Sequence, residues 1–114
     1  MKTKTTLVLS GTLLFALAGL TPAHAAPDAA AAQALMDSNK CIKCHDVEKS
    51  KSGPSLKKIG AKYKGKAEGE EKVIKNITTA PMVKLDDGTE EEHKVIKTKD
   101  QAQLKNLAQW ILSH

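Results

Sequence analysis

Cys41-Ile42-Lys43-Cys44-His45 is the stretch of this 114-residue sequence that predicts a fold. In an exported protein, a C-x-x-C-H run is the attachment signature of c-type haem. Two thiols three positions apart can add to the two vinyl groups of haem, which places His45 beneath the iron as its proximal ligand. The motif therefore predicts thioether bonds at Cys41 and Cys44 and an axial imidazole from His45.

Other interpretations of the two cysteines find less support in the sequence. A C-x-x-C pair also occurs in thioredoxin-like redox proteins, but no βαβ pattern surrounds this one. Cysteine together with histidine can bind zinc, but the motif supplies too few ligands for a closed zinc site. A disulfide between Cys41 and Cys44 is the remaining alternative, and an oxidising compartment would permit it.

The first 25 residues have the pattern of a cleaved secretory signal peptide. Lys2 and Lys4 give a charged start, residues 7–20 an apolar stretch, and Ala23-His24-Ala25 a cleavage site. The apolar stretch is too short to cross a membrane comfortably, and no other run is apolar enough. We expect a soluble periplasmic protein of residues 26–114 with no membrane span.

The predicted mature chain is small and mildly basic. Residues 26–114 form one domain whose only aromatic residues are Tyr63 and Trp110, so a buried porphyrin would complete a thin core. The 18 lysines of the chain, less Lys2 and Lys4, face 13 acids, a net charge of about +3. Arginine is absent and the aromatic residues are not interleaved with lysines, so nucleic-acid binding is not supported.

Charge is distributed unevenly along the chain. Nine lysines cluster around and after the C-x-x-C-H motif, and five acids form a run further on. The lysines are Lys40, Lys43, Lys49, Lys51, Lys57, Lys58, Lys62, Lys64 and Lys66, and the acids are Asp86, Asp87, Glu90, Glu91 and Glu92. Two interpretations stay open: an ordinary solvated surface, and a charge dipole that orients the protein on a redox partner.

Capping residues and apolar spacing predict three helices before residue 80. The first begins after Asp28 as its N-cap and runs towards Cys41. The second spans residues 56–63, after the chain break at Gly53-Pro54. The third spans residues 68–79.

The C-terminal part of the chain predicts a fourth helix. Thr98 and Gln101 have the spacing of a capping box, and the apolar face that follows continues towards His114. Between the third and fourth helices, residues 83–85 and 94–96 could pair as a small hairpin or form an ordered loop.

The order of these features resembles the class I cytochrome c family over nearly all of residues 26–114. The resemblance is carried by the C-x-x-C-H motif, Gly53-Pro54-Ser55-Leu56, Tyr63-Lys64-Gly65 and residues 107–113. It implies an all-α cytochrome c fold, with about four helices around one covalently attached haem and with the first and last helices crossing. It also implies that the Pro54 carbonyl accepts a hydrogen bond from the proximal imidazole and that Tyr63 belongs to the haem site.

The resemblance leaves the sixth ligand of the iron open. The family usually uses a methionine on the loop before the last helix, and Met82 is the only methionine after the haem motif. In the family this ligand typically lies about 16 or 17 residues before the aromatic residue of the last helix. Trp110 is 28 positions after Met82 but 17 after His93, and Met82 lacks the proline that commonly follows the family's methionine. We therefore prefer His93 as the distal ligand and keep Met82, or an open site, as alternatives.

The resemblance implies one-electron transfer rather than catalysis, because a small chain wrapped around haem has little room for a substrate pocket. We expect a monomer whose partners are redox proteins, such as a multihaem cytochrome, a reductase or a terminal oxidase. Residues 86–113 are also similar to monohaem cytochromes associated with extracellular iron oxidation or reduction. The alternatives are a small-ligand-binding or oxygen-reactive haem protein, and a dedicated haem subunit of a periplasmic dehydrogenase.

Overall fold

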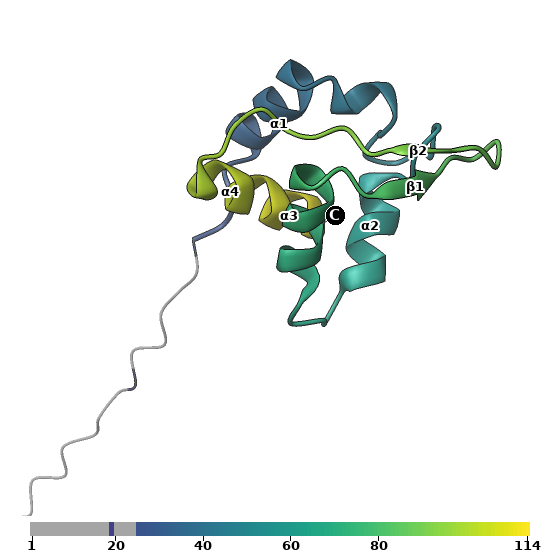
Figure 1. Ribbon diagram of the computed structural model, residues 1–114. Coiled ribbons are helices and arrows are strands. Elements are labelled where there is room, and N and C mark those ends of the chain that lie inside the picture. Colours follow the sequence, from purple (N-terminus) through teal and green to yellow (C-terminus); the bar gives the residue numbers. More distant parts are fainter. Residues whose placement is uncertain (1–18, 20–24) are drawn as a thin grey trace, which may run out of the picture.

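Four α-helices and one short hairpin make up the part of the chain that the structure, a computed structural model, describes: residue 19 and residues 25–114 (Figure 1). In chain order they are α1 (Ala29–Ser38), the 3-10 turn η1 (Cys41–Lys43), α2 (Leu56–Tyr63), α3 (Gly69–Thr78), β1 (Met82–Lys84), β2 (Glu90–Glu92) and α4 (Gln101–Leu112). The predicted signal peptide, residues 1–25, lies outside the described residues except for Gly19 and Ala25. The prediction of a mostly helical fold is confirmed.

Helix α1 begins where its capping residue predicts. The Asp28 carboxylate accepts a hydrogen bond from the Ala31 N–H at 3.0 Å, which satisfies one of the free donors at the helix start. The helix ends at Asn39, and Lys40 then adopts a left-handed conformation with φ 59°. This reversal leads directly into the 3-10 turn that carries Cys41.

The core lies where α1, from the start of the described chain, packs against α4, from its end. Ala32 and Met36 of α1 and Leu104, Leu107 and Ala108 of α4 are buried there. The small side chains of Ala32 and Ala108 allow the two helix backbones to approach closely.

Asn106 on α4 also joins the two helices through polar contacts. Its Oδ1 accepts a hydrogen bond from the Asp28 N–H at 2.7 Å, and its Nδ2 donates to the Asp28 carbonyl at 2.9 Å. Residues 78 positions apart are thus connected at the start of α1.

The start of α4 differs from the prediction. Asp100, not Thr98, is the N-cap, because its carboxylate accepts hydrogen bonds from the N–H groups of Ala102 and Gln103. The Thr98 hydroxyl instead accepts a hydrogen bond from the Asp100 N–H at 3.1 Å and so stabilises the capping residue.

Helices α2 and α3 both pack against α4. The predicted range of α2 is confirmed, and its N-cap Ser55 accepts a hydrogen bond from the Lys58 N–H. The predicted range of α3 included its two caps, Glu68 and Thr79. Gly60 on α2 faces the end of α4, where the rings of Trp110 and His114 meet edge to face at 4.7 Å.

The predicted hairpin is present, but with a different second strand. Met82–Lys84 pairs antiparallel with Glu90–Glu92, in a register that sets Val83 opposite Glu91. Residues 94–96 form no strand, because the Ile96 N–H donates to the Ile77 carbonyl of α3 at 2.8 Å. The segment after β2 therefore runs back along the helices, and Ile96 is buried there.

We expect Gly60→Ala to destabilise the protein. A Cβ at this position would lie 2.6 Å from the His114 carbonyl oxygen, so α2 and the end of α4 would have to separate. The clash should outweigh the roughly 1 kcal/mol by which alanine favours a helix over glycine, giving a net loss of about 1–3 kcal/mol. Urea unfolding of the haem-loaded chain measures the free energy of unfolding.

The matched control for this prediction is Lys57→Ala, on the same helix. Lys57 forms an exposed ion pair with Glu48 at 2.8 Å, and pairs of this kind contribute at most about 1 kcal/mol. Equal unfolding free energies for Gly60→Ala and the unmodified chain would contradict the proposed close packing.

Candidate functional site

A cavity of about 460 Å³ opens among α2, α3, the hairpin and the C-x-x-C-H segment. Its walls are largely apolar, from Met36, Leu56, Ile59, Val73, Ile77, Val83, Leu85 and Ile111. Of the site residues predicted from the sequence, Cys41, Cys44, His45, Pro54, Tyr63 and His93 line it. The fold thus brings together residues from four separate parts of the chain around one cavity.

The 3-10 turn places both cysteines at the cavity. In such a turn, side chains three positions apart lie on the same side. Cys44 closes the turn through a hydrogen bond from its N–H to the Cys41 carbonyl at 3.1 Å. Both thiols are half-buried, and burial raises the pKa of the Cys41 thiol above its usual value. Two neighbouring thiols facing one cavity suit two thioether bonds to a single ligand.

His45 is held in one orientation by the residues that follow it. Its Nδ1 donates a hydrogen bond to the Pro54 carbonyl at 2.7 Å, the bond that the family resemblance predicts. Because a carbonyl only accepts, Nδ1 carries the proton and Nε2 keeps its lone pair free. Burial lowers the pKa of His45, against the raising effect of the bond to Pro54, which favours the neutral form of the ring that can bind a metal.

Gly53 makes the close contact between the Pro54 loop and the imidazole possible. A Cβ on Gly53 would lie 2.8 Å from Cε1 of His45 and 3.2 Å from the Cys44 carbonyl oxygen. The Gly53 N–H donates to that same carbonyl at 3.0 Å. Any larger residue would displace either the imidazole ring or the loop.

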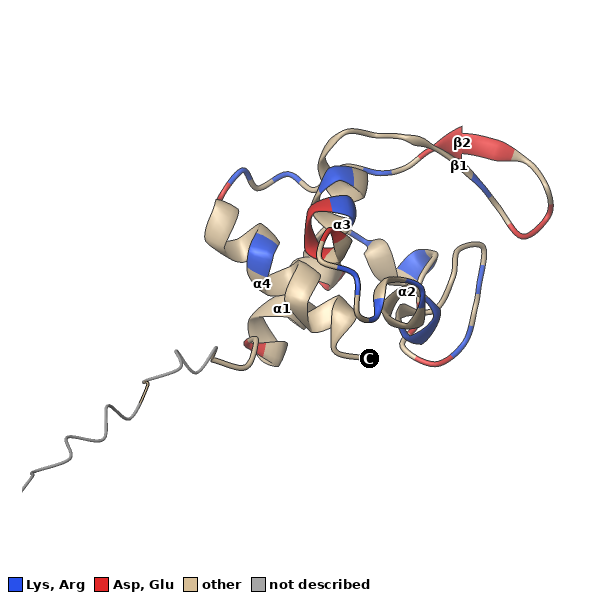
Figure 2. Ribbon diagram, turned by 90° about the horizontal axis from the view of Figure 1, so that it is seen from below, with Lys and Arg blue, Asp and Glu red and all other residues tan. Residues whose placement is uncertain are grey.

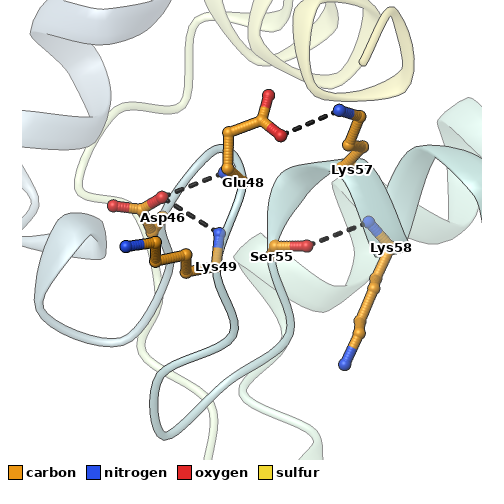
Figure 3. A network of polar contacts seen from close by, with 6 residues as sticks. All are labelled: Asp46, Glu48, Lys49, Ser55, Lys57 and Lys58. Atoms are coloured by element: carbon orange, nitrogen blue, oxygen red, sulfur yellow. Dashed lines mark hydrogen bonds and ion pairs between the residues drawn. The ribbon is translucent and has the colours of Figure 1, made fainter.

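The loop between His45 and Pro54 is held by polar contacts at both ends (Figure 3). At one end, Asp46 Oδ1 accepts hydrogen bonds from the N–H groups of Glu48 and Lys49 at 2.9 and 3.1 Å, which lowers the pKa of Asp46. At the other end, Ser55 caps α2. An ion pair between Glu48 and Lys57 joins the loop to that helix. The hydrogen bonds of Asp46 and Ser55 thus order the two ends of the loop that carries the Pro54 carbonyl.

His93 reaches the cavity from the opposite side, directly after β2. Its N–H donates to the Pro81 carbonyl at 2.8 Å, which extends the hairpin pairing by one residue. Its Nδ1 donates to the Lys94 carbonyl at 2.9 Å, so Nε2 is again the free nitrogen. Both histidines thus commit the same ring nitrogen to a backbone carbonyl and keep the other available.

The two imidazole rings have a spacing that fits one metal ion between them. Their centroids are 6.0 Å apart and their planes are inclined by 43°. An imidazole nitrogen binds a metal at about 2 Å, and its ring centre lies roughly 1 Å further out, so two such rings on one metal have centroids roughly 6 Å apart. Together with the thiols and the apolar walls, this spacing fits a haem whose iron lies between His45 and His93.

The two other predicted site residues have different surroundings. Met82 lies on β1, is 60% exposed and is not among the residues that line the cavity. Tyr63 ends α2 at the cavity wall, half-buried, with Lys62 Nζ 5.5 Å from the centre of its ring.

Sequence reasoning missed the contacts that position His93. The acceptors are the backbone carbonyls of Pro81 and Lys94, and every residue type has such a carbonyl. The hairpin residues Val83 and Leu85, which line the cavity, could have been suspected from their apolar character beside a charged turn.

Comparisons with known proteins give the family of this chain. The cytochrome c family model matches residues 29–114. The class 1 cytochrome MtoD from Sideroxydans lithotrophicus ES-1 is 50% identical, with a TM-score of 0.73, over 77% of this chain and 97% of that one. Cytochrome c552 of Nitrosomonas europaea is 32% identical, with a TM-score of 0.56, over 71% of this chain and 96% of that one.

A curated relative, cytochrome c-551 of Allochromatium vinosum, is 35% identical over 52 residues. That match spans 46% of this chain and about half of the relative, 55% of its length. The family match includes the C-x-x-C-H motif and all four helices described above. On the strength of the family match, the cavity and its two thiols, the chain belongs to the cytochrome c family, binds one covalent haem c and transfers electrons.

Proposed function

We propose that this cytochrome is a diffusible periplasmic carrier of single electrons, with an iron held by His45 and His93. The observation that carries the proposal is the pair of imidazoles 6.0 Å apart, each with Nδ1 bonded to a carbonyl. Bound haem supplies an iron that alternates between two oxidation states. The roles of Cys41 and Cys44 as thioether sites, and of Pro54 and Tyr63 at the haem, belong to the same proposal.

His93 is the preferred distal ligand over Met82 because of where each side chain lies. His93 lines the cavity and faces His45, whereas Met82 is exposed on the hairpin. Ligation by Met82 would require β1 to turn towards the cavity, which would disrupt its pairing with β2. Since imidazole gives a lower reduction potential than a thioether ligand, the proposal implies a lower-potential carrier.

Two protein ligands held from both sides suit electron transfer. The Pro54 carbonyl keeps the His45 ring oriented, and the Lys94 carbonyl does the same for His93. These bonds also increase the basicity of the imidazoles, which favours the oxidised metal. An iron that keeps both ligands has no free position for oxygen or another small molecule, so the proposal favours a carrier over an enzyme.

The charge around the cavity supports docking to redox proteins. Five lysines and one acid line the cavity: Lys40, Lys58, Lys62, Lys84, Lys94 and Glu91. Figure 2 shows lysines on α2 and acids on β2 and the hairpin turn, whereas α3 carries both charges. We call the five lysines that line the cavity the lysine-rich rim. We propose that this rim orients an acidic redox partner, such as a multihaem cytochrome, a reductase or a terminal oxidase.

The periplasmic location rests on the sequence of the first 25 residues, with its lysines, apolar stretch and A-x-A site. Among the residues that the structure describes, none of the helices has the length and apolar character needed to cross a membrane.

Substituting His93 and Met82 one at a time shows which of the two side chains is the distal ligand of the iron. We expect the unmodified oxidised protein to be low-spin and to lack the far-red sulfur-to-iron charge-transfer band, because no thioether binds the iron. His93→Ala should lose the low-spin EPR signal and bind carbon monoxide when reduced. Met82→Ala should match the unmodified protein in both measurements.

A charge-transfer band that disappears only in Met82→Ala would show methionine ligation and overturn the assignment of His93. A high-spin spectrum in the unmodified protein would favour a ligand-binding or oxygen-reactive haem protein instead.

Gly53→Ala tests the hydrogen bond on the proximal side. The added Cβ would displace the His45 ring and weaken its 2.7 Å bond to Pro54. A less basic imidazole favours the reduced iron, so we expect a higher midpoint potential in spectroelectrochemical titration. The control Gly88→Ala lies at the hairpin turn, where no atom is within 4 Å of an added Cβ, although its φ of 86° makes some loss of stability expected. An unchanged potential in Gly53→Ala would mean that the bond does not tune the iron.

Salt should slow electron exchange with anionic reagents. With ferricyanide as oxidant, we expect the rate to fall several-fold between about 0.01 M and about 1 M salt, as the Debye length falls from about 30 Å to about 3 Å. Lys62→Gln at the cavity rim should reduce both the rate and its salt dependence. The matched control Lys105→Gln, on the exposed side of α4 away from the cavity lining, should change neither. If the rate depended equally on salt in the unmodified protein, Lys62→Gln and Lys105→Gln, the lysines that line the cavity would not attract the anionic reagent.

A further inference from the structure

Asn39 connects two parts of the chain that approach the haem site from different sides. It is the C-cap of α1, and its Nδ2 donates to the Leu35 carbonyl at 2.9 Å. Its Oδ1 accepts a hydrogen bond from the Lys97 N–H at 3.0 Å, across 58 positions of sequence. One half-buried amide therefore joins the helix that leads into Cys41 to the segment that follows His93.

The segment of residues 93–97 depends on few hydrogen bonds to the rest of the protein. The His93 N–H bonds to the Pro81 carbonyl and the Ile96 N–H to the Ile77 carbonyl. The third bond, from the Lys97 N–H, goes to the Asn39 side chain. Of these three bonds within the described residues, only this one has a side-chain acceptor. It is also the only one of the three that connects the segment to the end of α1.

The bond from Lys97 to Asn39 lies at the end of the same segment that begins with His93. Residues 93–97 form no helix or strand and are mostly exposed, so their backbone is held by these three bonds and by the burial of Ile96. The acceptors of the other two bonds, Ile77 on α3 and Pro81 directly before β1, both lie on the α3 side of the cavity. The bond to Asn39 is the hydrogen bond that holds the far end of the segment, at Lys97, to the end of α1 and so to the chain that leads into Cys41.

We propose that Asn39 is a positioning residue that keeps His93 at the iron. The inference rests on the proposed ligation by His93. In the oxidised protein an exogenous ligand can bind the iron only when His93 leaves it, so its binding rate reports how often the segment opens. Loss of one neutral hydrogen bond corresponds to roughly a five-fold change in such an opening equilibrium.

The test is cyanide binding to the oxidised, haem-loaded chain, followed by stopped-flow absorption. Asn39→Leu keeps a side chain of similar shape but removes all three side-chain hydrogen bonds, including the one from Lys97, and we expect cyanide to bind roughly five-fold faster. Asn39→Ala removes the same bonds without added bulk, and should show the same increase. Asn39→Asp keeps the Oδ1 acceptor for Lys97 and loses only the bonds that Nδ2 donates to Leu35 and Ser38, so its cyanide rate should match that of the unmodified protein.

The Asn39→Asp variant separates positioning from capping. A residue that only capped α1 would fail equally in Asn39→Asp and Asn39→Leu, because both lose the bond to the Leu35 carbonyl. The matched control is Asn106→Leu, which removes a similar pair of side-chain bonds between α1 and α4. It should lower the free energy of unfolding and leave the cyanide rate unchanged.

Two results would overturn the inference. One is an unchanged cyanide rate in both Asn39→Leu and Asn39→Ala, and the other is an equal increase in Asn106→Leu. If His93 did not bind the iron, the unmodified protein itself would show a sulfur-to-iron band or a high-spin spectrum. That result is distinguishable from a failure of the role proposed for Asn39. A low-spin spectrum without that band, together with unaltered cyanide rates, would reject the role of Asn39 alone.

Discussion

The spacing of two imidazole rings is the constraint on which this structure depends. The centroids of the His45 and His93 rings are 6.0 Å apart, which matches the separation expected for two imidazoles that bind one metal. Each ring must also be held in one tautomer, which the Pro54 and Lys94 carbonyls achieve. The helices contribute apolar side chains to the cavity that both imidazole rings line.

Features fixed by local sequence could be predicted well. The Asp28 cap and the range of α2 each depend on residues close together in the chain, whereas the hydrogen bond from His45 to Pro54 was predicted from the family resemblance. The cofactor followed from the C-x-x-C-H motif, whose spacing has a chemical reason, and the family match agrees with it. The choice of His93 relied on its distance along the chain from Trp110, and the ligand roles themselves stay a prediction.

Features fixed by long-range contacts were predicted less well. Three successive glutamates have little preference for a strand, yet Glu90–Glu92 pairs with β1 because the turn after Leu85 returns the chain in that register. Ile96 belongs to an apolar run typical of a strand, but its N–H finds an acceptor on α3. In both cases the local structure depends on which distant residue the backbone pairs with. The sequence near Glu90–Glu92 or near Ile96 does not reveal that distant residue.

The two sides of the haem site are held by different kinds of contact. His45 is positioned by residues within ten positions of it, in a loop closed by its own hydrogen bonds. His93 is positioned by a hairpin stem and by residues of α1 and α3 far away in the sequence. Left-handed backbone at two non-glycine residues, Lys40 and Ala80, accompanies the turns that lead to these two sides. Such strain, of order 1–2 kcal/mol each, persists only where surrounding contacts determine the turn. The side proposed for the distal ligand therefore depends on contacts between distant parts of the chain, whereas the His45 side is held by residues near it in the sequence.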